Sequence, residues 1–395
     1  MRIAIVGAGI AGLTSALALS GRGHEITLLE RRTGFGETGA GIQLSPNATR
    51  ILFGLGLGPA LQRHGCEPGG IRIRSLRRGA EIGRVALGAT MRERFGAPYL
   101  AIARADLHTA LLDAVRARTD IRLLVGRGAQ QVANGAGEAE IRGESAGGQT
   151  GSLAVDLVIG ADGVWSRTRA ALGETRPPAY SGYAAYRATL PADARPAGLG
   201  ADETGLWLGR GGHVVLYPVA AGRALNLVVV SRRRMPEEGW SREADPGEIA
   251  RALADAEPGL RRLAAGAPGW SAWSLFEHSA RILARGRIAL AGDAGHPVLP
   301  FLAQGGALAI EDAAQLAALL GEDAAQVPAA LRAYETARLP RVRRVQEAAA
   351  RNGRAYHAGG LVALARDAVM RRLGPEGMRE RHAWLYGWTA PERTA

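Results

Sequence analysis

Short apolar runs and helical patterns alternate through the first part of the chain. An apolar run at Arg2–Val6 is followed by helix formers at residues 13–20 and by a second apolar run at Glu25–Glu30. Strands that alternate with helices favour a parallel sheet with crossover helices. Two later runs, residues 157–159 and 288–291, are short and apolar in the same way. The pattern predicts one parallel sheet built from segments that are far apart in the chain.

The middle of the chain has a different pattern. Strand-like runs separated by turn residues occur at residues 183–190, 206–208, 214–217 and 224–230. Such runs are typical of an antiparallel sheet, and the alternation over residues 71–87 predicts a β-hairpin. We therefore expect a β-rich domain inserted into the parallel fold, with a helix at residues 246–257.

Helices are predicted after several turns. Asp106 is expected to be the N-cap of one helix, and another helix follows Gly306, where apolar residues recur at helical spacing. Further helices are expected at residues 329–351 and 361–372. Their arginine-rich faces are expected to be solvated surface.

These patterns predict an α/β fold: a Rossmann-like parallel-sheet domain, an inserted antiparallel β-sheet domain and a C-terminal helical segment. The parallel-sheet domain would comprise residues 1–70, 98–175 and 280–345, the inserted domain residues 71–97 and 176–279, and the helical segment residues 346–395. A length of 395 residues with 47% hydrophobic content is ample for such a core.

Charge and cysteine content narrow the classes of partner. All 49 basic residues are arginines, against 37 acidic residues, and the net charge is +12. Because the arginines are scattered, we expect no nucleic-acid binding and a mild preference for anionic small molecules. Cys66 is the single cysteine, so an intramolecular disulfide is impossible, and we predict no metal site.

Glycines interrupt the uncharged segment 3–19, so we expect a cytoplasmic protein without an integral membrane segment.

A G-x-G-x-x-G motif stands in the first turn. Gly7, Gly9 and Gly12 follow the first strand, and Glu30 ends the second strand 18 residues after Gly12. The glycines permit a tight turn, approach of a pyrophosphate to the backbone and close helix packing. The helix N-terminus offers free N–H groups to that pyrophosphate, and Glu30 can accept from ribose hydroxyls. The motif predicts an adenine-dinucleotide site.

Two further turns place a carboxylate after an apolar strand. Asp162 lies in the turn at residues 160–163, and Asp293 lies in the turn at residues 292–297. Turns at the carboxyl ends of a sheet suit a polar, phosphate-bearing ligand. Since these turns are far apart in sequence, they predict one large cofactor that distant parts of the chain contact.

In this order, the three turns resemble the fingerprints of the single-component flavoprotein aromatic hydroxylases, in particular the salicylate hydroxylase-like branch. The resemblance rests on Gly7-Ala8-Gly9-Ile10-Ala11-Gly12 with Glu30, Gly160-Ala161-Asp162-Gly163, Gly292-Asp293-Ala294-Gly295-His296-Pro297, Gly41-Ile42-Gln43-Leu44-Ser45-Pro46-Asn47 and Pro300-Phe301-Leu302-Ala303-Gln304-Gly305. It covers nearly the whole chain. It implies tightly but non-covalently bound FAD, with NAD(P)H as a transient co-substrate because only one G-x-G-x-x-G occurs.

The resemblance also implies roles for single residues at the FAD. It places Gly7, Gly9, Ile10, Ala11 and Gly12 at the pyrophosphate, Glu30 and Arg31 at the adenosine ribose, Arg104 near the pyrophosphate or ribityl chain, Gly292 and Asp293 at a ribityl hydroxyl, Gly305 and Gly306 at the pyrimidine edge, and Gly41, Gln43 and Gln304 in supporting stretches. Asp162 and Gly163 would serve both FAD and the nicotinamide cofactor. From the residues alone, Arg104 could equally be a solvated loop charge.

The chemistry implied is hydride transfer from NAD(P)H to FAD, capture of O2 as a flavin C4a-hydroperoxide, and transfer of oxygen to an activated aromatic ring. A base near the substrate hydroxyl would make a phenol more reactive. His213 is the candidate, because an unperturbed pKa near 6.5 suits that task, with a satisfied surface histidine as the alternative. Tyr217 is a second candidate or ordinary core, apolar Pro297 is expected to help keep water from the flavin, and His296 is expected to be structural.

We expect the substrate to be a small hydroxybenzoate-like, salicylate-type phenolic acid. A related enzyme acting on a heteroaromatic, hydroxynicotinate- or urate-like, or on a larger secondary metabolite would share every FAD motif. His213 disfavours urate, because urate-hydroxylating relatives resemble this stretch with arginine in its place. A non-hydroxylating FAD-binding oxidase, reductase or redox interaction module is the other alternative. The oligomer is expected to be a monomer or homodimer.

Overall fold

Six strands form the predicted parallel sheet, in the order β18-β19-β11-β1-β2-β7. Their bounds are β1 (Arg2–Val6), β2 (Glu25–Glu30), β7 (Ile121–Val125), β11 (Leu157–Gly160), β18 (Ala284–Arg285) and β19 (Ile288–Leu290). In this computed structural model, which describes residues 1–36, 41–145, 147–236 and 242–391, neighbouring strands pair in parallel except β18, which is antiparallel to β19. The predicted sheet of distant segments is confirmed.

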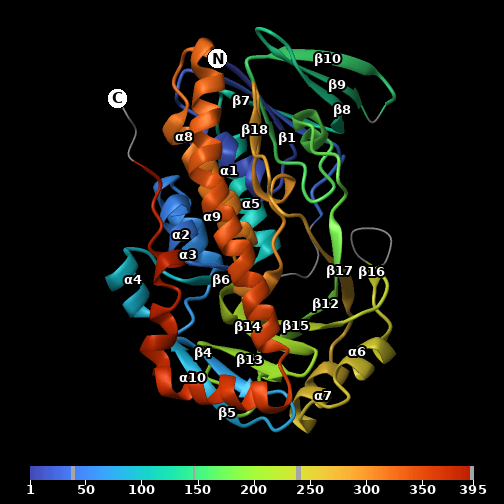
Figure 1. Cartoon of the computed structure of the whole chain (residues 1–395), viewed down its shortest axis with the longest axis vertical. Coiled ribbons are helices and arrows are strands. Elements are labelled where there is room, and N and C mark those ends of the chain that lie inside the picture. Colours follow the sequence, from blue (N-terminus) through green and yellow to red (C-terminus); the bar gives the residue numbers. More distant parts are fainter. Residues whose placement is uncertain (37–40, 146, 237–241, 392–395) are drawn as a thin grey trace.

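Helices cover one face of this sheet and a small sheet covers the other (Figure 1). The helical layer contains α1 (Ile10–Leu19), α2 (Pro46–Gly54), α3 (Gly58–His64), α5 (Arg104–Arg116) and α8 (Gly305–Leu319). The small sheet is antiparallel and contains β8 (Arg127–Asn134), β9 (Ala139–Ser145) and β10 (Thr150–Val155). Ile3 and Ile5 point into the helical core, whereas Ala4 and Val6 point into the other core. Burial on both faces explains the continuous apolar runs in these strands.

The second body is an eight-stranded sheet in the order β16-β17-β12-β15-β14-β13-β4-β5. Its strands are β4 (Gly70–Ser75), β5 (Glu81–Ala86), β12 (Ala179–Pro191), β13 (Glu203–Gly209), β14 (Gly212–Val219), β15 (Ala224–Arg232), β16 (Arg242–Glu243) and β17 (Ser271–Glu277). All neighbours are antiparallel except β13 and β4. The predicted hairpin is β4–β5. The strands β3 (Gly41–Leu44) and β6 (Leu100–Ala103) pair with each other, and β6 packs against β14.

Two predicted helix boundaries were wrong. The helix predicted at residues 246–257 is α6 (Pro246–Ala252), and α7 (Pro258–Ala265) is separate. Glu257 lies outside both because a residue before proline avoids the helical conformation, and its carboxylate instead accepts from two N–H groups of α7. Asp106 is not an N-cap: α5 begins at Arg104, with Ala103 at the N-cap.

The C-terminal helices join the two bodies. Helix α9 (Val327–Tyr356) runs along the molecule from the parallel sheet to the eight-stranded sheet (Figure 1). Helix α10 (Gly360–Glu380) then crosses β5, and α4 (Ala89–Phe95) and α11 (Ala383–Tyr386) complete the same core. The boundary predicted between residues 345 and 346 lies inside α9.

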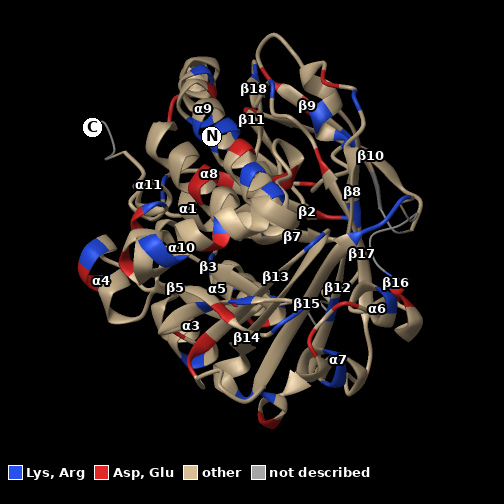
Figure 2. Cartoon of the chain, turned by 60° about the horizontal axis from the view of Figure 1, so that its bottom comes forward, with Lys and Arg blue, Asp and Glu red and all other residues tan. Residues whose placement is uncertain are grey.

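Basic and acidic residues are interspersed along the chain in both bodies of the molecule (Figure 2). Within the described parts of the chain, every helix is too short or too polar to cross a membrane.

Candidate active site

The G-x-G-x-x-G turn joins β1 to α1 without room for side chains at two of its glycines. Gly7 has φ +102°, and a Cβ there would lie 2.5 Å from the Ala161 carbonyl oxygen. A Cβ on Gly12 would lie 1.8 Å from the Gly7 carbonyl oxygen. By contrast, a Cβ on Gly9 would have no neighbour within 4 Å. Gly7 and Gly12 therefore allow close packing of backbone segments, whereas Gly9 leaves the helix N-terminus open to a ligand.

A cavity of about 920 Å³ lies at this turn, at the carboxyl ends of β1, β2 and β11. Its walls include Gly7, Gly9, Glu30, Arg31, Arg104, His108, Asp162, Gly163, Trp165 and Trp273. The Glu30 carboxylate accepts from the N–H groups of Ala8 and Arg32, both at 2.9 Å. His108, which sequence reasoning missed, donates to the Ala8 carbonyl at 2.8 Å. Strand β2 and helix α5 thus both fix the shape of the glycine turn.

Asp162 is used differently from the expectation. Its carboxylate accepts from Ser166 Oγ at 2.6 Å and from the N–H groups of Arg167 and Thr168 at 2.9 and 3.0 Å. Thr168 is the first residue of the 3-10 turn Thr168–Leu172, so these bonds fix the start of that turn. Gly163, with φ +78°, remains open to the cavity. The turn thus presents its backbone to a ligand more directly than its carboxylate.

A buried arginine ties the second turn to the third. Arg169 donates to the carbonyls of Ala294 at 3.0 Å and Val164 at 2.8 Å. Desolvation outweighs the nearby Asp162 and Glu174 and lowers the pKa of its guanidinium. The two carboxylate turns, far apart in sequence, are therefore fixed relative to each other.

The remaining predicted residues form a second group around the GD loop, residues 292–304. Gly292 has φ +61°, and a Cβ there would lie 3.0 Å from the Cβ of Ala11 in the first motif. Burial raises the pKa of Asp293, which His296 and Arg104 partly counteract. Arg104 thus lies close enough to act on Asp293 and is more than a solvated loop charge.

The GD loop leads into α8, whose N-terminus lies against β3. A Cβ on Gly306 would lie 2.6 Å from Ile42 Cδ1. A Cβ on Gly41 would lie 2.6 Å from the ring of Tyr217. Gln43 accepts from the Tyr99 hydroxyl at 2.8 Å. The structure brings these predicted residues together, and the helix dipole of α8 points its positive end toward them.

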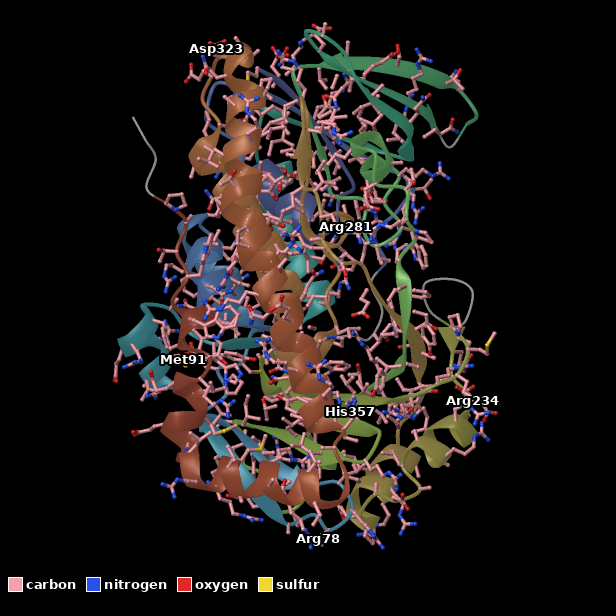
Figure 3. All side chains as sticks on the ribbon, in the orientation of Figure 1. Arg78, Met91, Arg234, Arg281, Asp323 and His357 are labelled. Atoms are coloured by element: carbon pink, nitrogen blue, oxygen red, sulfur yellow. The ribbon has the colours of Figure 1, made fainter. Side chains whose placement is uncertain are left out.

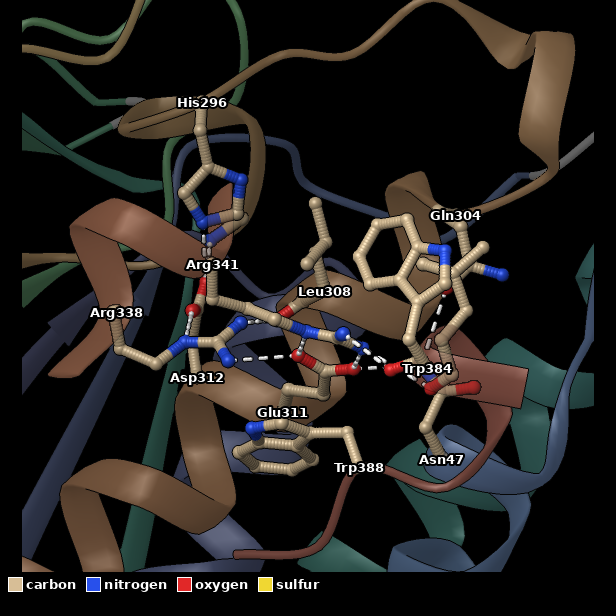
Figure 4. Close-up of polar contacts among 12 residues, drawn as sticks. Asn47, His296, Gln304, Leu308, Glu311, Asp312, Arg338, Arg341, Trp384 and Trp388 are labelled. Carbon is tan, nitrogen blue, oxygen red and sulfur yellow. Dashed lines mark hydrogen bonds and ion pairs between the residues drawn. The ribbon is translucent and has the colours of Figure 1, made fainter. Parts of the chain in front are cut away.

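A buried ionic network connects the GD loop to α8 and α9 (Figure 4). His296 Nε2 lies 2.6 Å from Asp312 Oδ2, which also accepts from the Gly292 N–H at 2.8 Å. Arg338 donates to Asp312 at 2.8 Å and to Glu311 at 2.7 Å. Asp312, Glu311 and Arg338 are fully buried. His296 is therefore part of the support of the loop, as predicted.

The same network reaches α2 and the C-terminal residues. Asn47 Nδ2 donates to Glu311 at 2.6 Å and to Gln304 Oε1 at 3.1 Å. Arg341 donates to Glu311 at 2.7 Å and to the Trp384 carbonyl at 2.9 Å. The expectation that arginines of this helix are solvated was wrong for Arg338 and Arg341, because their partners lie on α8. Arg338 and Arg341 are three residues apart and therefore lie on one face of the helix, which is the only sequence signal that they share the partner Glu311.

Inward-facing residues of the eight-stranded sheet form the other wall of the site. His213, Val215 and Tyr217 alternate along β14 and face the same side. On that side Ala185 and Val230 pack against Leu299 and Phe301 of the GD loop. Burial raises the pKa of the Tyr217 hydroxyl far above its ordinary value. Tyr217 lies on β14 and its ring packs against Gly41 of β3, so it connects this sheet to the group around the GD loop.

His213 is buried, which contradicts the pKa argument that singled it out. Burial and the neighbouring His357 lower its pKa to about 3. The imidazole is therefore neutral at every physiological pH. A neutral imidazole still accepts a hydrogen bond, so its geometry remains compatible with a base while the value of 6.5 does not apply.

Arg187 on β12 faces the same side and was missed by sequence reasoning. Its guanidinium lies 5.4 Å from the ring centroid of Trp273, which lines the cavity. Its charge also acts on Tyr217. Strand alternation with Tyr183 and Ala185 was the signal that could have found it.

Pro297 is buried in the GD loop, and its carbonyl accepts from Gln346 on α9 at 3.1 Å. The same amide donates to the His278 carbonyl at 2.8 Å. This anchorage fixes the apolar part of the loop over the sheet, in keeping with the predicted exclusion of water.

Comparison with known proteins identifies the class. Residues 1–349 match the family model of the FAD binding domain, and the chain belongs to this family of FAD-dependent aromatic hydroxylases, as predicted. The glycine turn, the open helix N-terminus and Glu30 at the cavity end of β2 fit the cofactor.

Individual relatives span the whole chain. It is 39% identical to 3-amino-4-hydroxybenzoate 2-monooxygenase PtnB3 of Streptomyces platensis, over 98% of this chain and 96% of that protein. It is 31% identical to 3-hydroxybenzoate 6-hydroxylase of Klebsiella oxytoca, over 98% and 97%. A salicylate hydroxylase substrate complex superposes with a TM-score of 0.82 at 25% identity, covering 98% of this chain and 96% of that one.

Proposed function

We propose that this enzyme hydroxylates a small phenolic acid of the hydroxybenzoate class, with NAD(P)H and O2 as co-substrates. The observation that carries the proposal is the inward face of the eight-stranded sheet, where the guanidinium of Arg187 acts on Tyr217 and an apolar loop packs on the same face. A guanidinium matches the geometry of a carboxylate. The relatives named for hydroxybenzoate substrates support the same class.

The residues would divide the work between two walls. Gly7, Gly9 and Gly12 would hold the FAD pyrophosphate, Glu30 and Arg31 its ribose, and Arg104 and Asp293 its ribityl region. The chemistry that FAD supplies when bound is to accept a hydride from NAD(P)H and to activate O2. Gly305 and Gly306 would place the positive end of α8 where reduced flavin is negative.

The substrate wall would orient the ring and remove a proton. Arg187 would bind the carboxylate, and His213 would accept the hydroxyl hydrogen through its neutral imidazole. Pro297, Leu299 and Phe301 would keep water from the reacting atoms. Residues 71–97 and 176–279 would form the substrate domain, as the sequence predicts.

A substrate panel tests this proposal. The purified protein is supplied with FAD and offered 3-hydroxybenzoate, 3-amino-4-hydroxybenzoate, salicylate, 6-hydroxynicotinate and urate, with phenol as the carboxylate-free control. We expect a benzoate to stimulate NAD(P)H oxidation and to incorporate oxygen from ¹⁸O2, with phenol a poor substrate. Hydroxylation of 6-hydroxynicotinate or urate alone would assign a heteroaromatic enzyme instead. If every compound yields only hydrogen peroxide, hydroxylation is refuted.

A further inference from the structure

Two histidines from distant parts of the chain form a buried pair. His213 lies on β14, and His357 is the C-cap of α9. His213 Nδ1 lies 2.8 Å from His357 Nε2, and the rings are stacked with centroids 5.1 Å apart. At this distance one proton lies between the two nitrogens, because two lone pairs or two N–H groups would repel. The pair thus has a defined set of tautomers.

Both rings are held by their surroundings. Phe301 contacts the two imidazoles edge-on, with ring centroids 5.6 Å from His213 and 5.3 Å from His357. The backbone N–H of Gly211 donates to the His357 carbonyl at 3.1 Å. The outer nitrogens, His213 Nε2 and His357 Nδ1, make no hydrogen bond within the described residues, and His357 Nδ1 is fully buried.

We propose that His357 is the positioning residue that makes His213 a base, by accepting the Nδ1 hydrogen of His213 so that the lone pair of Nε2 is available to the substrate hydroxyl. The inference rests on the proposed function, because it assumes a hydroxylated aromatic bound against His213. It goes further by assigning the source of that basicity to a residue outside every sequence motif.

The proton transfer balances within the pair. The substrate O–H bond breaks, an Nε2–H bond forms on His213, and its Nδ1–H hydrogen bond to His357 shares the resulting positive charge. The proton then passes from His213 Nε2 to water, and Nε2 is again unprotonated for the next turnover. A cavity of about 1870 Å³ whose lining includes His213 and His357 lies beside the pair. The substrate oxygen keeps the electron pair, which makes the ring more nucleophilic.

The charges around the pair favour release of that proton. Burial and Arg232 lower the pKa of His357 to about 4, and His213 is also neutral. Burial raises the pKa of Tyr356 to about 12, so this neighbour stays uncharged, and Tyr183 packs on His357 at 4.7 Å. The cavity is lined by Arg210, Arg232 and Arg366 and by the acids Glu248, Asp255 and Asp367, and His357 lies at the end of α9 (Figure 3). Arg366 is paired with Asp367 at 2.7 Å, so Arg232 is the cation that disfavours a charged His357.

The test compares His357→Phe, which keeps an aromatic ring but removes the acceptor, with His357→Gln, which keeps an acceptor. We expect His357→Phe to lower kcat for hydroxylation about tenfold to hundredfold at neutral pH, with KM little changed. This loss is smaller than the roughly 10²- to 10⁴-fold contribution of a general base, because the base itself remains. The rate of this variant should rise with pH as the substrate ionises by itself. The wild-type rate should be flat from about pH 5 upward, because both imidazoles are neutral there. His357→Gln should recover most of the rate.

A control variant and a substrate-free measurement complete the design. His64→Gln, at the end of helix α3, should behave as wild type. Nitrogen-15 spectra of histidine-labelled protein should show His213 protonated at Nδ1 and unprotonated at Nε2, with a mixture of tautomers in His357→Phe. A protonated Nε2 in wild type, or equal losses in both His357 variants at every pH, would overturn the inference. Failure of the substrate panel leaves the spectra unaffected, so the two proposals fail separately.

Discussion

At the scale of single residues, chemical type and surroundings decide function together. His213 lies on β14, but burial and a second histidine lower its pKa and keep it neutral. Glu30 ends β2 and Asp162 follows β11, as the sequence pattern predicts, and both carboxylates accept from backbone N–H groups of neighbouring turns. These motif residues therefore stabilise the backbone of the site in the absence of a ligand.

The two glycines Gly9 and Gly12 are expected to differ in their tolerance of alanine. Gly9→Ala should leave the free energy of unfolding of the apoprotein nearly unchanged and weaken FAD binding, because the new methyl group enters only the ligand space. Gly12→Ala should destabilise the apoprotein itself, since its Cβ overlaps the Gly7 carbonyl. Urea unfolding and FAD titration of both variants measure this difference. Equal stability of the two apoproteins would contradict it.

His213→Ala should keep its yellow FAD and its aromatic-stimulated NAD(P)H oxidation but lose about 10²-fold or more of hydroxylation, the usual contribution of a general base. Reducing equivalents would appear as hydrogen peroxide. Assays of hydroxylated product and of hydrogen peroxide on the same samples measure how the reducing equivalents divide between the two, with His64→Ala as control. Unchanged product formation would remove His213 from the mechanism.

At the scale of elements, the packing of α9 on α8 fixes the GD loop. Neither helix pattern showed this contact, because a charged residue on an amphipathic helix is normally solvated. The complete burial of Arg338 between Glu311 and Asp312 reverses that expectation. Burial disfavours the Asp312 carboxylate, but His296, Arg338 and two hydrogen bonds outweigh it and lower its pKa.

Arg338→Met should lower the free energy of unfolding by about 3–5 kcal/mol, because two buried carboxylates lose their cation. Arg351→Met on the same helix, whose side chain is 58% exposed, is the control and should cost at most about 1 kcal/mol. The Asp312 pKa is lower in the folded state, so its contribution is present above the unfolded pKa and lost as pH falls through the folded pKa. The difference between Arg338→Met and wild type should therefore shrink below about pH 4. Denaturant titrations across pH 3–8 test both statements.

At the scale of the whole molecule, the cofactor would contact two groups of residues held by different elements. The first group, the glycine turn and the Asp162 turn, forms the cavity of about 920 Å³. The second group surrounds the GD loop, residues 292–304. Arg169 connects the second turn to the third through two backbone carbonyls, and the charge of Arg104, which lines the cavity, acts on Asp293 in the GD loop. One ligand spanning both groups should therefore stabilise the fold more than a ligand that reaches only one.

Removal of FAD should lower the thermal midpoint by several degrees. Binding at a hundredfold excess over Kd contributes about 2.7 kcal/mol. FMN, which lacks the adenosine half, should restore less of the midpoint at matched concentrations, because it leaves the Glu30 cavity unfilled. Differential scanning calorimetry of apoprotein with FAD, FMN or neither measures this. Equal restoration by FMN would show that the first motif does not hold the adenosine.

The sequence by itself determined the parallel sheet, the antiparallel insert, the three turns and the class of cofactor, because apolar periodicity and backbone-restricted glycines are local properties. Only the tertiary structure decided that Arg338 is buried, that His213 is neutral and paired with His357, and that Arg187 faces the same side as Tyr217. Each of these depends on which distant residue lies opposite, and desolvation by that residue sets its charge and its chemistry.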